Sequence, residues 1–118
     1  MIRTAYKIVE WDGKSAKTLF HTSTRGREIP RGKWVRALSR SGRDGTSKTW
    51  YTTGWHSLPT LADAKAYGKK FVKRLDRLRI VKCRIKNTWP KTHSPSPVLL
   101  SLWLKFDRVV AKVSGGVK

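Results

Sequence analysis

The fold of this chain must leave most of its 27 Lys and Arg side chains in water, because only seven Asp and Glu side chains are available to pair with them. The excess gives a formal net charge of +20, and it is spread over both halves of the 118 residues. Hydrophobic residues make up 38% of the chain and include six Trp, which is enough apolar surface for a core. We therefore expect a single folded domain over residues 1–118 with a strongly cationic surface.

The first half of the chain has the pattern of short antiparallel strands. Residues 6–11 are rich in aromatic and β-branched side chains, and the dipeptide Asp12-Gly13 favours a turn that returns the chain as a second strand over residues 17–22. Residues 33–38 and 48–53 have the same character and are separated by a glycine-containing loop. We expect these segments to pair into a small sheet.

A helix is predicted over residues 60–78. Thr60 can cap its first turn, and Asp63 occupies the position that favours the positive end of a helix. Apolar residues recur at three- and four-residue spacing, namely Leu61, Ala64, Gly68, Phe71, Leu75 and Leu78. The other side of this helix would carry a row of Lys and Arg side chains.

Residues 80–86 alternate, as a half-buried strand does. Apolar side chains point one way and cationic ones the other, with Val81, Cys83 and Ile85 on the first side and Lys82, Arg84 and Lys86 on the second.

The last third is predicted to contain a proline-rich connecting loop over residues 88–97 and then a C-terminal helix. Ser96-Pro97 has the form of a helix start, and Leu99, Trp103, Phe106, Val110 and Val113 fall on one helical face. Leu100, Leu102, Leu104 and Phe106 also alternate as in a strand, and we prefer the helix. The predicted fold is thus α+β, with an antiparallel sheet of about four to five strands and two helices packed on it.

Catalytic and metal-binding patterns are sparse. His21, His56 and His93 are far apart, Cys83 is the only cysteine, and no glycine-rich phosphate loop occurs. We expect no enzyme activity, no metal, no cofactor and no disulfide, and we interpret His56 as a structural residue. No stretch approaches the roughly 20 apolar residues of a membrane span, and the first residues lack an apolar export signal, so we expect a cytoplasmic protein without a membrane partner.

Cationic residues define the candidate binding site. On a helix or a strand, cations spaced about 5–7 Å apart can contact successive phosphates, so we expect the helix and the following strand to bind nucleic acid. These candidates are Lys65, Lys69, Lys70, Lys73, Arg74, Arg77, Lys82, Arg84 and Lys86, and a second basic region adds Arg36, Arg40, Arg43 and Lys48. The alternative interpretation is a solvated basic surface without a partner.

The tryptophans could stack on bases, since aromatic platforms beside cations are typical of proteins that bind single strands. Trp34, Trp55 and Trp103 lie in apolar patterns and are predicted to be in the core. Trp50, Tyr51 and Trp89 are better candidates for exposure.

A resemblance rests on three segments in fixed order. They are Tyr6-Lys7, the segment Ile29-Pro30-Arg31-Gly32-Lys33-Trp34-Val35-Arg36-Ala37, and Gly54-Trp55-His56. This pattern resembles small bacteriophage-type proteins of uncharacterised function over about residues 5–67, and it implies a phage origin without a known activity. A looser likeness to ADP-ribosyltransferase-like folds implies an enzyme, but residues 59–118 contain no Glu of the kind that such enzymes commonly use.

Three functions follow as expectations. The first is a small, basic, phage-like protein that binds DNA or RNA in the host cytoplasm without catalysis. The second is a phage-encoded inhibitor or adaptor that docks on an acidic host protein or on a nucleoprotein such as a defence complex or a polymerase. The third is an ADP-ribosyltransferase-like enzyme or a virion protein that condenses DNA.

Overall fold

The computed structural model describes residues 1–18, 28–37, 41–43, 50–52, 54–71, 75–91 and 95–113, with the backbone alone for 41–43 and 50–52. The elements in chain order are β1 (Ile2–Trp11), β2 (Ala16–Thr18), β3 (Glu28–Ile29), β4 (Trp34–Arg36), β5 (Ser41–Arg43), β6 (Trp50–Thr52), β7 (Trp55–Ser57), α1 (Leu61–Gly68), the 3₁₀ turn η1 (Leu75–Arg77), β8 (Leu78–Pro90) and β9 (Leu99–Lys112).

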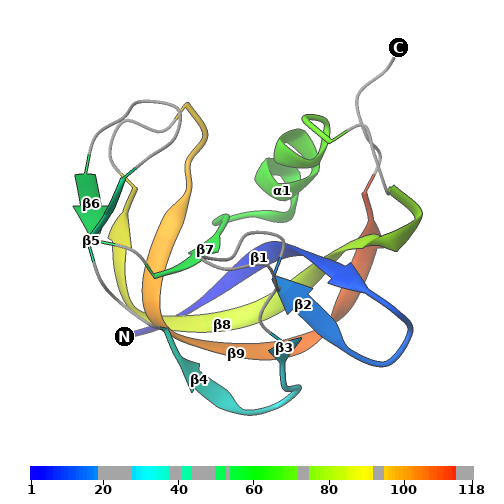
Figure 1. Cartoon of the computed structure of the whole chain (residues 1–118), viewed down its shortest axis with the longest axis horizontal. Helices are drawn as coiled ribbons and strands as arrows, with labels where there is room; N and C mark the ends of the chain where they lie inside the picture. Colours follow the sequence, from blue (N-terminus) through cyan, green and yellow to red (C-terminus); the bar gives the residue numbers. More distant parts are fainter. Residues whose placement is uncertain are drawn as a thin grey trace.

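Most strands belong to one antiparallel sheet of seven strands, in which the order is β3-β2-β1-β8-β9-β4 and β7 also pairs with β9 (Figure 1). Leu58, the residue after β7, connects this end of the chain to β1, because Leu58 and Tyr6 of β1 exchange backbone hydrogen bonds of 2.7 and 2.8 Å. The segment from β7 to Leu58 thus pairs with both β9 and β1. The backbone nitrogen of Gly32 likewise donates to Phe106 of β9 at 2.8 Å. These contacts bring both sides of the sheet together, so that it curls around its core.

The predicted opening hairpin is confirmed. The backbone nitrogens of Lys14 and Ser15 both donate to the Asp12 carboxylate at 2.8 Å, and Gly13 adopts a φ of +94° that favours glycine. This turn returns β1 into β2, and residues 19–22 of the predicted second strand lie outside the described residues.

The predicted fold with two helices on a sheet of four to five strands is wrong. Within the described residues α1 is the one α-helix, and the segment predicted as the C-terminal helix is the long strand β9. It pairs with β8 from the Leu99–Pro90 end to the Lys112–Arg79 end. Both periods fitted this segment locally, and the long-range hydrogen bonds to β8 decide between them. The proline-rich loop is correspondingly shorter, since β8 continues through Pro90.

The first predicted helix exists but ends early. Thr60 is its N-cap as expected, and its side chain accepts a 3.0 Å hydrogen bond from the backbone nitrogen of Asp63. The helix stops at Gly68, where a Cβ atom would lie 3.0 Å from the Val113 side chain. Leu78, predicted as the last helical residue, is the first residue of β8. The predicted cationic helix row to residue 78 therefore does not form.

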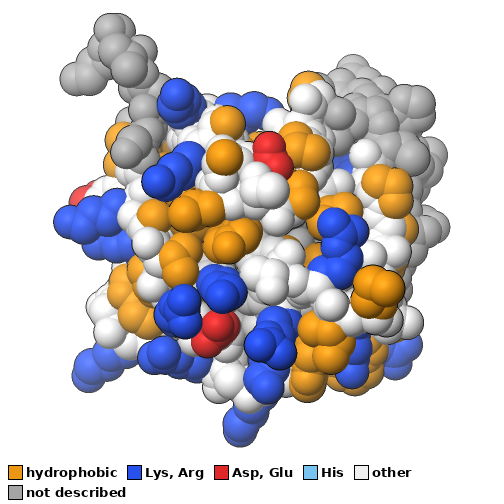
Figure 2. All heavy atoms as spheres, turned by 180° about the vertical axis from the view of Figure 1, so that it is seen from behind, with side chains coloured by type: hydrophobic (Ala, Val, Ile, Leu, Met, Phe, Trp, Pro, Cys, Tyr) orange, Lys and Arg blue, Asp and Glu red, His pale blue; other side chains and the backbone are white. Residues whose placement is uncertain are grey.

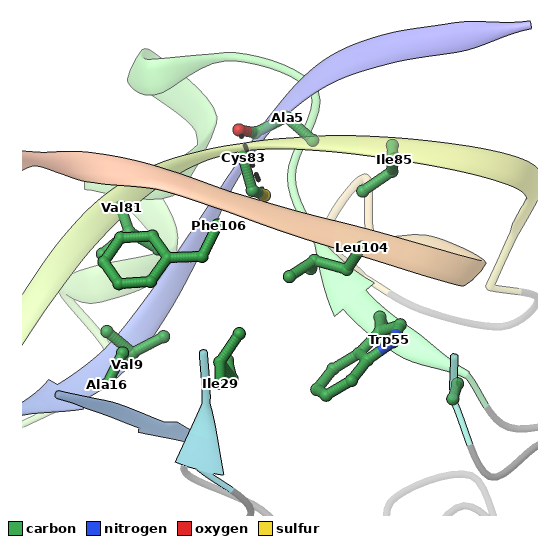
Figure 3. Packing of buried hydrophobic residues seen from close by; sticks show 11 residues of the cluster. Ala5, Val9, Ala16, Ile29, Trp55, Val81, Cys83, Ile85, Leu104 and Phe106 are labelled. Carbon is green, nitrogen blue, oxygen red and sulfur yellow. Dashed lines mark hydrogen bonds between the residues drawn. The ribbon is translucent and has the colours of Figure 1, made fainter. Parts of the chain in front are cut away.

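The core of the curled sheet is drawn in Figure 3, where side chains from β1, β2, β3, β7, β8 and β9 point toward one another. Phe106 of β9 is 2% exposed, and Trp55 of β7 is 4% exposed, as predicted for Trp55. The alternation predicted for residues 80–86 is confirmed in the same place. Val81, Cys83 and Ile85 belong to this cluster, whereas Arg84 is exposed and Lys82 and Lys86 are half-buried.

A second apolar cluster lies on the opposite face of the same strands. Ile8 of β1 and Ile80 of β8 pair directly and pack there with Ala64 of α1. Ile80 and Val81 are both buried because neighbouring strand residues point to opposite faces, and α1 covers the outer one at this end. Beyond Ile80, the next three outer positions of β8 are the cations Lys82, Arg84 and Lys86.

Candidate functional site

Three strands combine tryptophans and cations on the outer face of the sheet. In the strand register, Arg36 of β4 lies opposite Trp103 of β9, and Trp103 lies opposite Lys86 of β8. The next row on the same face consists of Trp34 of β4, Lys105 of β9 and Arg84 of β8. Directly paired residues share a face, as do alternate residues of one strand. We call the six residues of these two rows the outer β4–β9–β8 face: Trp34, Arg36, Arg84, Lys86, Trp103 and Lys105.

The residues between these rows confirm which way the face points. Val35, Leu104 and Ile85 occupy the intervening row and pack in the core cluster. The six side chains of the outer face therefore project away from the core. Arg36 and Arg84 are exposed, and the other four are half-buried.

Lys86 lies between the two tryptophans. Its ammonium nitrogen is 4.5 Å from the centre of the Trp34 ring and 5.3 Å from the centre of the Trp103 ring. Both distances are within the range of a cation–π attraction, which orients the rings and the ammonium together. The three side chains thus form one aromatic and cationic cluster on the outer face.

Four cations of β8 and β9 lack acidic partners among the described residues. No described carboxylate forms an ion pair with Lys82, Arg84, Lys86 or Lys105; the ion pair found there joins Arg108 to its exposed neighbour Asp107 at 4.0 Å. An exposed pair at that distance contributes little energy. In Figure 2, Lys and Arg side chains lie among hydrophobic ones, and acidic side chains are sparse. The positive charge therefore remains available to an anion from outside.

The site predicted from the sequence is only partly assembled. Lys82, Arg84 and Lys86 lie on the outer side of β8, and Arg36 joins them through β4. The other described candidates are exposed and belong to α1 and to the segments that follow it, namely Lys65, Lys69, Lys70 and Arg77. The ammonium nitrogen of Lys70 donates a 2.9 Å hydrogen bond to the Ser96 hydroxyl oxygen and lies 4.7 Å from the centre of the Tyr67 ring.

The remaining candidates fall outside the described residues, as Lys73, Arg74, Arg40 and Lys48 do, and only the backbone of Arg43 is described. The same holds for the side chains of Trp50 and Tyr51, predicted to be exposed. Trp89, predicted with them, is half-buried.

Sequence reasoning missed Trp34, Trp103 and Lys105 as members of the site. Both tryptophans were predicted to be in the core, but each lies half-buried on the outer face. The signal was present in the alternation of Leu100, Leu102, Leu104 and Phe106, since a strand with these residues on one side places Trp103 and Lys105 on the other.

The core side of the sheet encloses Lys7, which is 8% exposed. Its ammonium nitrogen donates a 2.6 Å hydrogen bond to the backbone oxygen of His56 and lies 5.8 Å from the Trp55 ring centre. Desolvation lowers the pKa of Lys7 to about 8, because burial penalises the charged form. The His56 carbonyl is thus an anchor for a buried amine, and the predicted structural role of the His56 side chain stays a prediction.

Cys83 lies in the same core and is fully buried. Its sulfur donates to the backbone oxygen of Ala5 at 3.4 Å (Figure 3). Desolvation raises the pKa of this thiol to about 12, which keeps it protonated and unreactive at neutral pH. Among the described residues, no group of three or more His, Cys, Asp or Glu side chains is arranged to hold a metal ion.

Comparison with known proteins identifies no relative: no protein-family model, no curated protein and no solved structure matches the chain. Within the described part of the chain, α1 is too short and too polar to cross a membrane, and no other helix there could do so.

Proposed function

We propose that this protein binds nucleic acid without catalysis, through the outer β4–β9–β8 face together with Lys82 and Arg108 at its edge. The observation that carries the proposal is that Arg84, Lys86 and Lys105, which have no carboxylate partner among the described residues, alternate with tryptophans on one sheet face. Alternate residues of β8 are about 6.6 Å apart, a spacing that a flexible phosphate backbone can follow.

A nucleic acid suits this surface better than a protein partner does. Protein interfaces usually have a central apolar or aromatic anchor that is accessible to the partner. Among the described residues, the large hydrophobic side chains that are exposed are Met1 and Ile2, at the N-terminus. The tryptophans of the outer face lie among cations, as in surfaces that bind polyanions.

Binding rather than catalysis is supported by the state of the reactive side chains. The Cys83 thiol and the Lys7 amine are enclosed in the core, where a substrate would have to displace packed side chains to reach them. A free thiol also suits a reducing compartment, so we propose the cytoplasm as the place of action.

The test is equilibrium binding of dye-labelled DNA and RNA, followed by fluorescence anisotropy at increasing KCl. If Arg36, Lys82, Arg84, Lys86, Lys105 and Arg108 each neutralise one phosphate, affinity should fall roughly 300-fold to 2,000-fold between 50 and 200 mM salt. An affinity that changes by less than about 10-fold over this range would refute phosphate neutralisation as the source of binding. Absence of binding to every polynucleotide would refute the proposed function itself.

A further inference from the structure

The cluster of Trp34, Lys86 and Trp103 combines one positive charge with two indole rings. If the outer face only neutralised phosphates, its rows would need cations alone, and half-buried indoles beside them would have no part in binding. Trp34 and Trp103 stand on adjacent strands in diagonal positions, since Trp34 is paired with Lys105. Diagonal neighbours of this kind are about 7–8 Å apart, within reach of one another for aromatic side chains.

This separation suits two successive bases of an extended strand. Each indole can stack on one base, and the sugar–phosphate link between the bases then passes close to Lys86, whose ammonium lies within 5.3 Å of both ring centres. In the free protein this ammonium interacts with the ring faces. On binding it can move to the phosphate, which leaves those faces to the bases.

A duplex does not fit this chemistry equally well. Its bases already stack on each other, and exposing a base face requires unstacking, which costs several kcal/mol per step. The three strands of the face also span only about 10 Å from β4 to β8, about half the width of a duplex. A single strand presents its base faces without that cost.

We propose that the outer β4–β9–β8 face is specific for single-stranded nucleic acid, with Trp34 and Trp103 as stacking platforms for two neighbouring bases and Lys86 as the contact to the phosphate between them. This inference rests on the proposed function and adds the class of nucleic acid and the mode of contact. The indoles provide affinity through base faces, so binding should depend on the bases and tolerate changes of sequence.

The experiment compares three probes of equal length at one salt concentration: a single-stranded oligonucleotide of mixed sequence, its duplex, and an abasic strand with the same phosphates. The unmodified protein should bind the single strand at least about 10-fold more tightly than the abasic strand, since each base stacked on an indole contributes about 5-fold to 150-fold. The duplex should bind more weakly than the single strand. These measurements need no variant, so they do not depend on whether a substituted protein folds.

Variants then assign the effect to the two indoles. Trp34→Leu and Trp103→Leu should each lower affinity for the single strand about 5-fold to 150-fold and leave affinity for the abasic strand unchanged. Trp34→Phe and Trp103→Phe keep an aromatic face and should restore part of the loss. Thermal unfolding of each variant verifies that it remains folded.

The outcomes separate the two proposals. Equal affinity for the single strand and the abasic strand, or tighter binding of the duplex, would overturn the stacking inference while leaving nucleic-acid binding in place. Normal single-strand binding by a folded protein that lacks both indoles would also overturn it. Failure to bind any of the three probes would remove the proposed function, and the inference with it.

Discussion

Neutralising two cations of the outer face tests where the phosphates bind. Arg84 is exposed and Lys105 is half-buried, they are paired across β8 and β9, and neither has a carboxylate partner among the described residues. In the double variant Arg84→Gln, Lys105→Gln, the slope of log affinity against log salt should fall by about 1.4 for a single strand or 1.8 for a duplex. If the affinities of the variant and of the unmodified protein become equal near 1 M salt, the affinity of the variant at 100 mM salt should be about 25-fold to 60-fold lower.

The matched control removes the same charge from the helical part of the surface that the sequence predicted. Lys65 and Lys69 are exposed, on α1 and just after it. The variant Lys65→Gln, Lys69→Gln should leave the salt slope close to that of the unmodified protein. Fluorescence anisotropy at four or more salt concentrations measures both slopes, and thermal unfolding should show little change, because surface substitutions usually alter stability by less than about 0.5 kcal/mol.

Two results would refute this reasoning. Equal slopes for the two double variants would mean that net charge, and not the outer face, determines binding. A larger decrease in the control would move the site to α1 and the segment that follows it, which the sequence predicted as one part of the binding surface.

Three further predictions concern the scaffold. Gly54→Ala should destabilise the protein by about 1–3 kcal/mol in urea unfolding, because the new Cβ would lie 2.7 Å from the backbone oxygen of Ser101; unchanged stability would show that β7 can shift away. The Cys83 thiol should react with a thiol reagent only after unfolding, given its burial and its pKa near 12, and rapid reaction of the folded protein would contradict the packing around it. Lys7 has a lower pKa in the folded state, about 8, than its ordinary 10.5, so the unfolded chain binds more protons between these values and stability should rise with pH. The rise from pH 8 to 9 should be about 1 kcal/mol and should be absent in Lys7→Met, and an identical pH dependence of the two proteins would refute the assignment. Above pH 9 the raised pKa of Cys83 acts in the opposite direction, since the folded state then retains a proton that the unfolded state loses.

Local sequence patterns correctly predicted the elements that depend on interactions between residues close together in the chain. Thr60 caps α1 because a side-chain hydrogen bond to the third residue of the helix needs only nearby atoms. The alternation of residues 80–86 was correctly interpreted for a similar reason: Val81, Cys83 and Ile85 share one side only at a period of two, and no competing set of apolar residues there fits a helical face. From this alternation alone, Lys82, Arg84 and Lys86 could be placed together on one side of a strand.

The segment of β9 shows where local patterns fail. Leu99, Trp103 and Phe106 fit a helical face, and Leu100, Leu104 and Phe106 fit a strand face, so two structures were compatible with one sequence. Pairing with β8 over the length of the strand determined the outcome, and that partner lies outside any local window. The error carried over to the site, because a helix places Trp103 in the core and a strand places it beside Lys86.

The sequence by itself determined that the protein would have a cationic body, because seven acidic residues cannot neutralise 27 basic ones in any fold. It also determined which side of β8 is charged. Only the tertiary structure decided that α1 covers the apolar end of the outer side of β8, near Ile80. It also decided that β4 and β9 place Trp34 and Trp103 beside Lys86 at the other end of this strand. These residues are far apart along the chain, and hydrogen bonds between strands, which no local pattern encodes, determine the register that joins them.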